Sequence, residues 1–379
     1  MAVHLLSGSR LPVAKSINQS SWEMGGTLVR EALERSGLDQ VDAIYASSMM
    51  SGELEGQMHL ASLIADEAGL SGVEAMDVSS VSASGAAALR AGYLAIMSGE
   101  VRSVAVVGVE RMSAGDANPV LRKALHAVRE ADKTMVLKNA DALALYLKNH
   151  GVAYESFANF AINAHRNGAR NPLALFQKEI DRNKVLEARV IAEPLRLYDC
   201  SPVCDGGACI ILSRSDFKAG PVKLTASACA TDRFILEDRT DPLDFLAARR
   251  SFQKACETSG RKTQDFKFFE VHDAFNIMAC LCLEACGFAE KGQGFRLAES
   301  EDIFPGGNLP VATMGGLKAR GHPIGATALY QAAEIFAQLT ESAGDNQLPG
   351  DKIGPALMQS IGGAGTTLFT HFFEPGADL

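Results

Sequence analysis

The sequence lacks an apolar run of about 18 residues, the length that a membrane helix needs, and its first 15 residues show no charged segment leading into an apolar stretch. Lysine and arginine are scattered rather than clustered, and the net charge is −9 with a pI near 5.5. Such a chain repels phosphate backbones. We therefore expect a soluble, cytoplasmic protein that binds neither membranes nor nucleic acid.

Cysteine is missing from the first half of the chain. All eight cysteines lie in the second half, and no second CxxC or histidine set matches their spacing. They are Cys200, Cys204, Cys209, Cys229, Cys256, Cys280, Cys282 and Cys286. Neither a zinc site nor a disulfide framework is expected, so we interpret the thiols as buried and reduced, and we expect no resident metal or cofactor.

What the chain does contain is an internal repeat. Residues 28–47 read as an amphipathic helix, a Ser-Gly stop and an apolar strand, and residues 250–270 repeat this pattern at an offset of 223. Residues 82–89, SASGAAAL, align with residues 322–329, HPIGATAL, at an offset of 240. Both of these segments begin a helix rich in alanine and leucine. The repeat predicts two matching halves that pack about a pseudo-twofold axis.

Each half ends in an apolar strand, at residues 103–109 and 355–361, and strands alternate with helices throughout. This alternation predicts an α/β fold with right-handed βαβ units and a mostly parallel sheet in each half. The helical, polar residues 113–198 interrupt the first half and are too long for a simple connection, so we expect them to cover a binding site. Gly220-Pro221 marks the boundary between halves 1–219 and 220–379.

Four candidate functional positions fall at the carboxyl ends of predicted strands, where ligands of α/β proteins collect. Ser82 and His322 each precede a helix whose first turn offers free N–H groups. His272 follows the strand FKFFE, and residues 360–363 follow the strand PALMQ. Two imidazoles beside such donors suit the stabilisation of an enolate or a tetrahedral oxyanion.

Each candidate also has a structural interpretation. Ser82 can serve as a helix N-cap, and His272 and His322 can be histidines whose rings are satisfied by backbone groups. The glycines of the turn IGGAG can simply allow two chain segments to approach closely. The functional interpretation is favoured because all four positions match topologically.

Several blocks taken together resemble the thiolase superfamily, in its sterol-carrier-protein-2 type branch with HDxF in place of NExF. The blocks are VSASGAAALRAGYLAIMSGE, VAVVGVERMS, NHGV with AHRNGARNP, PLRLYDCSPVCDGGA, EVHDAF, GGLKARGHPIGATA and SIGGAGTTLFTHFF. The resemblance implies a thiolase fold, in which two pseudo-twofold-related βαβαβ halves form five αβαβα layers with a helical loop insertion. It also implies lipid-metabolic, reversible Claisen chemistry on coenzyme A thioesters, as in acetyl-CoA acetyltransferases and 3-oxoacyl-CoA thiolases.

The resemblance also implies roles for single residues. In that family a cysteine before the long central helix is acylated, and the histidine of GHP, here His322, activates it. The histidine of HDxF, here His272, helps to bind the oxygen of the acceptor thioester. The N–H of Gly362 pairs with the N–H of the nucleophile to form an oxyanion hole.

The sequence departs from this pattern at the nucleophile, where Ser82 replaces the cysteine. Ser360 stands where many members carry a second, acid/base cysteine, and Ala274 stands where some members of the branch place it. Ala312 and Ala328 replace the usual asparagine and glycine of the neighbouring blocks. A hydroxyl is a much weaker acid than a thiol, so Ser82 is expected to be acylated slowly and to release the acyl group poorly.

Three explanations for Ser82 stay open. The serine can be an engineered replacement of a catalytic cysteine. The chain can also be a natural acyl-CoA enzyme with other chemistry, such as retro-aldol cleavage, or an inactive subunit that supports a partner. The absence of a second cysteine favours the two natural explanations, and the retained histidines and glycine turn favour an enzyme.

The expected ligand is an acyl-CoA, with coenzyme A as substrate or product. The family resemblance implies a homodimer or homotetramer joined through the sheet of the first half, and a possible small partner protein with a zinc ribbon and an OB fold. Arg166 and Arg170 are candidates for the CoA phosphates, although charges on a solvated helix face are the alternative interpretation.

Overall fold

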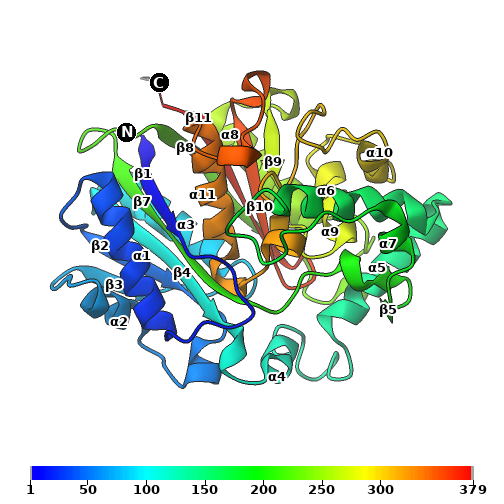
Figure 1. The fold of residues 1–379 in the computed structure, drawn as a ribbon, viewed down its shortest axis with the longest axis horizontal. Coiled ribbons are helices and arrows are strands. Elements are labelled where there is room, and N and C mark those ends of the chain that lie inside the picture. Colours follow the sequence, from blue (N-terminus) through cyan, green and yellow to red (C-terminus); the bar gives the residue numbers. More distant parts are fainter. Residues whose placement is uncertain (1, 377–379) are drawn as a thin grey trace.

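The computed structural model describes residues 2–376, and within this range nine strands form one mixed sheet (Figure 1). The strands are β1 (Val3–Arg10), β2 (Ala43–Ser47), β3 (Glu74–Asp77), β4 (Ser103–Arg111), β7 (Asp205–Arg214), β8 (Val222–Thr231), β9 (Phe268–Glu270), β10 (Ala356–Gly362) and β11 (Thr367–Pro375). Their order in the sheet is β3-β2-β4-β7-β1-β8-β11-β10-β9. The first five strands in this order come from the first half of the chain and the last four from the second half.

The two halves of the sheet have the same strand directions. In the first half, β2 pairs in parallel with β3 and β4, whereas β7 runs antiparallel to both β4 and β1. In the second half, β10 is parallel to β9, and β11 is antiparallel to β10 and β8. The prediction of a mostly parallel sheet is therefore wrong. A strand such as β11, which follows its neighbour through a tight turn, has to run back along it.

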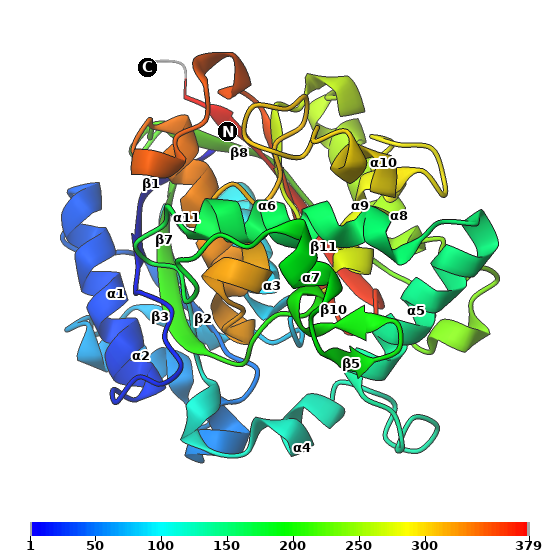
Figure 2. The same ribbon diagram turned by 45° about the vertical axis from the view of Figure 1, so that its right-hand side comes forward.

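Helices complete the predicted five layers. Helices α1 (Ser21–Ser36) and α2 (Leu60–Glu67) pack on the outer face of the first half, and α8 (Leu246–Ser259) packs on the outer face of the second half beside α9 (Asn276–Ala285). Helices α3 (Ser84–Ser98) and α11 (Thr327–Leu339) contact each other between the two halves of the sheet (Figure 2). The thiolase-type fold predicted from the sequence is confirmed.

The internal repeat is visible in the helix ends. Helix α1 ends at Gly37 and α8 at Gly260, and both glycines adopt a left-handed conformation, with φ of 64° and 75°. These conformations explain the two Ser-Gly stops, because glycine carries no Cβ that would clash there. One local prediction was wrong: residues 360–362 do not belong to a turn but continue β10, where Gly362 pairs with Thr367 of β11.

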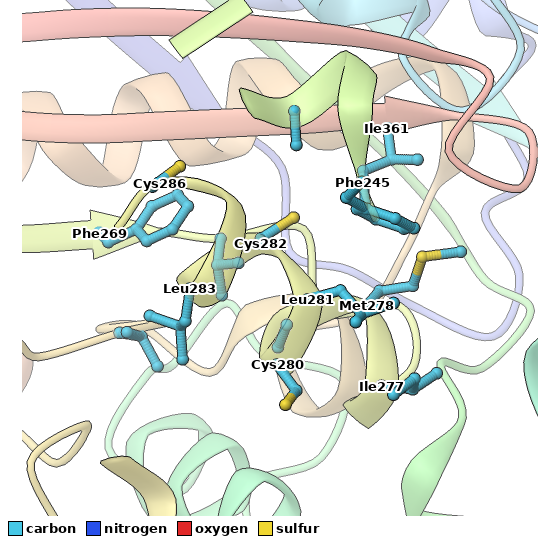
Figure 3. Close-up of a cluster of buried hydrophobic side chains, with 14 of the residues drawn as sticks. Phe245, Phe269, Ile277, Met278, Cys280, Leu281, Cys282, Leu283, Cys286 and Ile361 are labelled. Atoms are coloured by element: carbon cyan, nitrogen blue, oxygen red, sulfur yellow. The ribbon is translucent and has the colours of Figure 1, made fainter. Parts of the chain in front are cut away.

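The outer core of the second half contains three of the thiols. Cys280, Cys282 and Cys286 of α9 and its end lie among apolar side chains, with Phe269 and Ile361 close by (Figure 3). Among the described residues all eight cysteines are free thiols, and Cys200, Cys229 and Cys256 are half-buried. The prediction of buried thiols is thus confirmed for the other five.

The insertion at residues 113–198 is helical, as predicted. It contains α4 (Ala117–Arg122), α5 (Met135–His150), α6 (Ala158–Gly168), α7 (Arg182–Leu186) and a small hairpin of β5 (Val190–Ala192) and β6 (Leu195–Arg196). Its helix α5 packs against α9, and α6 packs against α10 (Gly294–Glu299) and residues 316–320. The insertion therefore covers the second half of the molecule. Among the residues described, the helices are too short or too polar to cross a membrane.

Candidate active site

Two buried histidines meet at the carboxyl end of the second-half strands. His272 follows β9, and His322 precedes the short turn Ile324–Ala326 that leads into α11. Their ring centroids are 5.3 Å apart and the ring planes are perpendicular, at 89°. The side chains are only 3% and 7% exposed. The structure thus brings together the two imidazoles that the sequence placed 50 residues apart.

The ring of His322 is held by its own helix. Its Nδ1 lies 2.6 Å from Oγ1 of Thr327, and that hydroxyl donates its single hydrogen to the carbonyl of Pro323 at 3.0 Å. A hydroxyl that donates to Pro323 accepts a hydrogen from Nδ1, so this network favours the tautomer with the proton on Nδ1 and a lone pair on Nε2. The backbone N–H of His322 donates to Sγ of Cys204 at 3.1 Å. His322 can therefore act as a base through Nε2.

Glu110, which sequence reasoning missed, fastens the His322 loop to the first half. Glu110 lies near the carboxyl end of β4, and its side chain is fully buried. The carboxylate accepts the N–H of Gly325 at 2.8 Å. It also accepts the N–H groups of Met49 and Met50, at 2.9 and 3.0 Å, and the hydroxyl of Ser48 at 2.6 Å. The signal was available in the sequence, because a single acidic residue follows the apolar run SVAVVGV.

Burial sets the charge state of both imidazoles. It lowers the pKa of His272 to about 4, although the neighbouring Asp273 acts in the opposite direction. It lowers the pKa of His322 well below its usual value, and His272 and Arg320 add to this effect. A low dielectric disfavours the charged form of histidine. Both rings are therefore neutral at pH 7 and able to accept a proton.

Ser82 lies in a strained turn just before α3. Val81 has a positive φ of 52°, which a β-branched residue rarely adopts. The N-cap of α3 is Ala83 rather than Ser82, and Ser84 ties the turn by donating to the carbonyl of Val81 at 2.6 Å and accepting the N–H of Ser80 at 2.8 Å. The half-buried Ser82 is thus not used as the helix cap.

Gly362 lies against the turn that carries Ser82. A Cβ added to Gly362 would stand 2.8 Å from the carbonyl oxygen of Ser80 and 3.5 Å from Cβ of Ala83. The glycine allows β10 to approach this closely. Gly362 and the start of α3 are therefore neighbours, and the oxyanion hole formed by the N–H groups of Gly362 and Ser82 stays a prediction.

The starts of α3 and α11 lie side by side. A Cβ added to Gly85 would stand 3.0 Å from the carbonyl oxygen of Gly325 and 3.3 Å from Cβ of Ala328. Ser82 precedes Gly85 by three residues, and His322 precedes Gly325 by three. The crossing of the two central helices therefore places these positions at the same end of the helix pair.

None of the positions that thiolases use for cysteine offers a thiolate. The hydroxyl of Ser360 is buried in β10 and has no hydrogen-bond partner among the residues described. Ala274 is buried, and its carbonyl accepts the N–H of Ser201 at 2.9 Å. Cys204 contacts the His322 loop, but burial raises the pKa of its thiol to about 12. Its sulfur is therefore a neutral thiol at pH 7.

A pocket of about 620 Å³ adjoins the HDAF segment. Its lining includes Cys200, Ser201 and Lys318, which are bonded to residues 273–275 through a β-bridge, a backbone hydrogen bond and an ion pair. The remaining lining is mostly apolar, includes two lysines, and comes from the insertion except for Pro202. It comprises Val136, His165, Leu175, Phe176, Gln177, Lys178, Ile180, Lys184, Ile191, Leu197, Tyr198 and Pro202.

The arginines proposed from the sequence lie elsewhere. Arg166 and Arg170 line a different hollow of about 490 Å³, together with Arg182 and Phe304. The lysines of the pocket beside HDAF escaped sequence reasoning, because their separation from His272 along the chain hides their proximity. In the described part of the chain, no group of three His, Cys, Asp or Glu residues is arranged to hold a metal ion.

Comparison with known proteins agrees with the thiolase-type fold. Residues 3–216 match the thiolase N-terminal domain, and residues 228–374 match the thiolase C-terminal domain-like family. The chain is 38% identical to an acetyl-CoA acetyltransferase of Methanothermobacter thermautotrophicus over 90% of this chain and 91% of that protein. It is 29% identical to sterol carrier protein 2 of Oryctolagus cuniculus over 80% of this chain and 59% of that protein.

Two solved structures share the fold. The Ltp2-ChsH2(DUF35) aldolase superimposes with a TM-score of 0.85 at 19% identity, over 100% of this chain and 98% of that chain. The Acat5 thiolase from Ascaris suum, solved in complex with coenzyme A, superimposes with a TM-score of 0.73 at 18% identity, over 99% of this chain and 100% of that chain. The family matches, which together span most of the sequence, show that this chain belongs to the thiolase family.

Proposed function

We propose that this chain cleaves or forms a carbon–carbon bond of a coenzyme A thioester through an enolate, without transferring an acyl group to a cysteine. One observation carries the proposal: two neutral, buried imidazoles are kept together while the positions at 82, 274 and 360 all lack a thiol. Enolate chemistry needs a base and donors for the thioester oxygen, but it needs no covalent nucleophile.

A retro-aldol reaction on a 3-hydroxyacyl-CoA fits these groups and balances without a co-reactant. Nε2 of His322 takes the proton of the hydroxyl as the Cα–Cβ bond breaks. An aldehyde or ketone leaves, and the electron pair remains on the thioester as an enolate. His272 and the N–H groups of Ser82 and Gly362 hold the enolate oxygen, and His322 returns the proton to Cα.

The pocket beside HDAF supports coenzyme A as part of the substrate. Its mostly apolar walls suit the pantetheine arm, and the exposed Lys178 and Lys184 provide positive charge for phosphates. The Acat5 thiolase of the same fold was solved with coenzyme A, and another protein of the fold is an aldolase solved with a DUF35 protein. We extend to this chain a CoA thioester substrate, a homodimer or homotetramer, and a possible small zinc-ribbon and OB-fold partner.

A second candidate is acyl transfer of the acetyltransferase type, with Ser82 Oγ as a slow nucleophile. The 38% identity to the acetyl-CoA acetyltransferase of Methanothermobacter thermautotrophicus favours it. In this case a 3-oxoacyl-CoA and free coenzyme A would give two shorter acyl-CoAs by way of an ester on Ser82.

The test separates the two reactions by their need for free coenzyme A. Purified protein is incubated either with a 3-hydroxyacyl-CoA alone or with a 3-oxoacyl-CoA and coenzyme A, and the acyl-CoA and carbonyl products are measured by mass spectrometry. We expect carbonyl release without coenzyme A from the wild type and from Ser82→Ala. Ser82→Cys serves as the matched control, in which thiolysis should appear.

The proposal fails if the wild type requires coenzyme A for turnover and Ser82 carries an acyl group in the intact-mass spectrum. That result would establish acyl transfer. Absence of both reactions over a range of chain lengths, in the wild type and in Ser82→Cys, would instead identify a binding subunit without turnover.

A further inference from the structure

We propose that Lys318 is a positioning residue of this site, which acts through Asp273 to join the loop of His272 to the loop of His322 and to neutralise the carboxylate beside His272. The inference deepens the proposed function and rests on it for its effect on turnover. Two of its claims do not depend on the reaction: that Lys318 and Asp273 join the two histidine loops, and that Lys318 neutralises the charge beside His272.

The pair is buried and well formed. Lys318 and Asp273 are each 2% exposed. The Lys318 Nζ donates to Asp273 Oδ2 at 2.8 Å and to the Asp273 carbonyl oxygen at 3.2 Å, and the backbone N–H of Leu317 donates to Asp273 Oδ1 at 2.7 Å. Both carboxylate oxygens are thus bound by the segment that leads to His322. One ammonium hydrogen of Lys318 remains, beside the pocket that this lysine lines.

The segment is shaped around the carboxylate. Gly316 has a φ of 55°, and a Cβ at this position would collide with both oxygens of Asp273. Glycine therefore permits the chain to wrap around Asp273. Because Asp273 directly follows His272, and Lys318 precedes His322 by four residues, the contact links the two imidazole loops at their bases.

Stability alone gives little reason to retain such a pair. Replacement of a buried ion pair by apolar side chains of similar volume is often neutral or stabilising, because desolvation offsets the attraction. The position of this pair, between the two histidine loops and at the wall of the pocket, points to a role in the site.

The pair also controls charge near His272. Burial is the largest influence on the pKa of His272 and lowers it, Asp273 raises it and Arg320 lowers it. The other groups that bear charge or titrate on the elements packed here are Lys318, His322, Tyr330 and Glu334, together with Glu270 at the end of β9. Without the charge of Lys318, Asp273 would stabilise a cationic His272. A cationic His272 would in turn weaken His322 as a base, since His272 already lowers the pKa of His322.

The decisive measurement is the titration of His272 by NMR in protein carrying 13C-labelled histidine, with His272→Asn to identify the signal. In Lys318→Met we expect the pKa of His272 to rise by about one unit or more, because the Asp273 carboxylate, which already raises this pKa, loses its neutralising cation. Asp273→Asn combined with Lys318→Met should return it close to the wild-type value. Lys318→Arg, which keeps the charge, should leave it unchanged.

Lys318→Gln provides the same test if Lys318→Met does not fold, because it keeps a donor for Asp273 and removes the charge. An unchanged pKa of His272 in a folded, uncharged variant would overturn the inference. This titration needs no turnover, so it remains decisive if the proposed reaction fails.

Turnover gives an independent readout. In the uncharged variants, the acidic limb of kcat/KM should move to higher pH by the same shift, and activity at pH 9 should approach that of the wild type. Equal loss at every pH would show a merely structural role and would contradict the proposed control of charge.

Discussion

The two central helices begin at equivalent points of the repeat, and their surroundings differ. Val81 and Gly321 occupy matched positions, and both have a positive φ, of 52° and 114°. Ser82 and His322 follow them. A positive φ is therefore built at both places, once with glycine and once with a strained valine.

The start of α3 is held by hydrogen bonds within its own turn, whereas the start of α11 is held by hydrogen bonds to the first half of the molecule. At α3, the side chain of Ser84 bonds to residues 80 and 81 of the same turn. At α11, Gly325 donates to Glu110 of the first half and His322 to Cys204. The comparison teaches that the repeat supplies the same helix start twice. Hydrogen bonds from the first half then fix the loop of His322, whereas the hydrogen bonds of Ser84 stay within the turn of Ser82.

Substitutions at the matched positions 82 and 322 should give the largest difference, which is expected in kcat/KM. If the reaction is noncovalent, His322→Asn should lower kcat/KM by between about 10² and 10⁴, the usual contribution of a general base. Ser82→Ala should lower it by no more than about tenfold, since it removes one hydrogen-bonding hydroxyl. Steady-state kinetics on one substrate decides the matter. Comparable losses in both variants would break the distinction between the two starts.

The hydrogen bonds that hold the starts of α3 and α11 should contribute differently to the free energy of unfolding. Glu110→Ala leaves three buried N–H groups without their acceptor and should lower the free energy of unfolding by about 3 kcal/mol or more. Ser84→Ala loses only local hydrogen bonds and should lower it by about 1 kcal/mol. Urea unfolding of both variants measures the difference. Glu110→Gln, which keeps an oxygen acceptor, should lie between Glu110→Ala and the wild type.

Acid should weaken the fold through the buried imidazoles. The pKa of His272 is about 4 in the folded chain, below the unfolded value of 6.5. Between these values the unfolded chain binds more protons, so stability is complete above pH 6.5 and falls as the pH drops, by about 2 kcal/mol at pH 5. Urea unfolding at pH 7 and 5 tests this, and His272→Gln should show a smaller loss. Equal pH dependence of the two proteins would refute the assignment.

The strained bend before Ser82 gives the smallest effect. Val81→Gly should raise the free energy of unfolding by about 1 kcal/mol, because relief of the positive φ outweighs the added freedom of the unfolded chain. Gly321→Ala is the matched control and should destabilise, since its Cβ would stand 2.6 Å from Cγ1 of Val13. Thermal unfolding compares the two. Destabilisation by Val81→Gly would show that packing of the valine matters more than its strain.

Much of the site could be predicted because it lies on the repeat. Residues 82 and 322 were located from two helix starts with the same sequence pattern, and the strand before His272 was an apolar run. Ser360 was assigned to a turn, since the glycines that follow it are typical of turns, yet pairing with Phe369 extends the strand through it. The roles of Ser82, His272, His322 and Gly362 in catalysis stay predictions.

The sequence by itself determined the duplicated α/β frame, the helical insertion and the four candidate positions, because hydrophobic periodicity and turn residues are local signals. Only the tertiary structure decided the antiparallel strands, the anchoring of Gly325 by Glu110, the Lys318–Asp273 pair and the lysines of the pocket. Such contacts join residues distant along the chain. They depend on which segments fold against each other, and no local pattern records that choice.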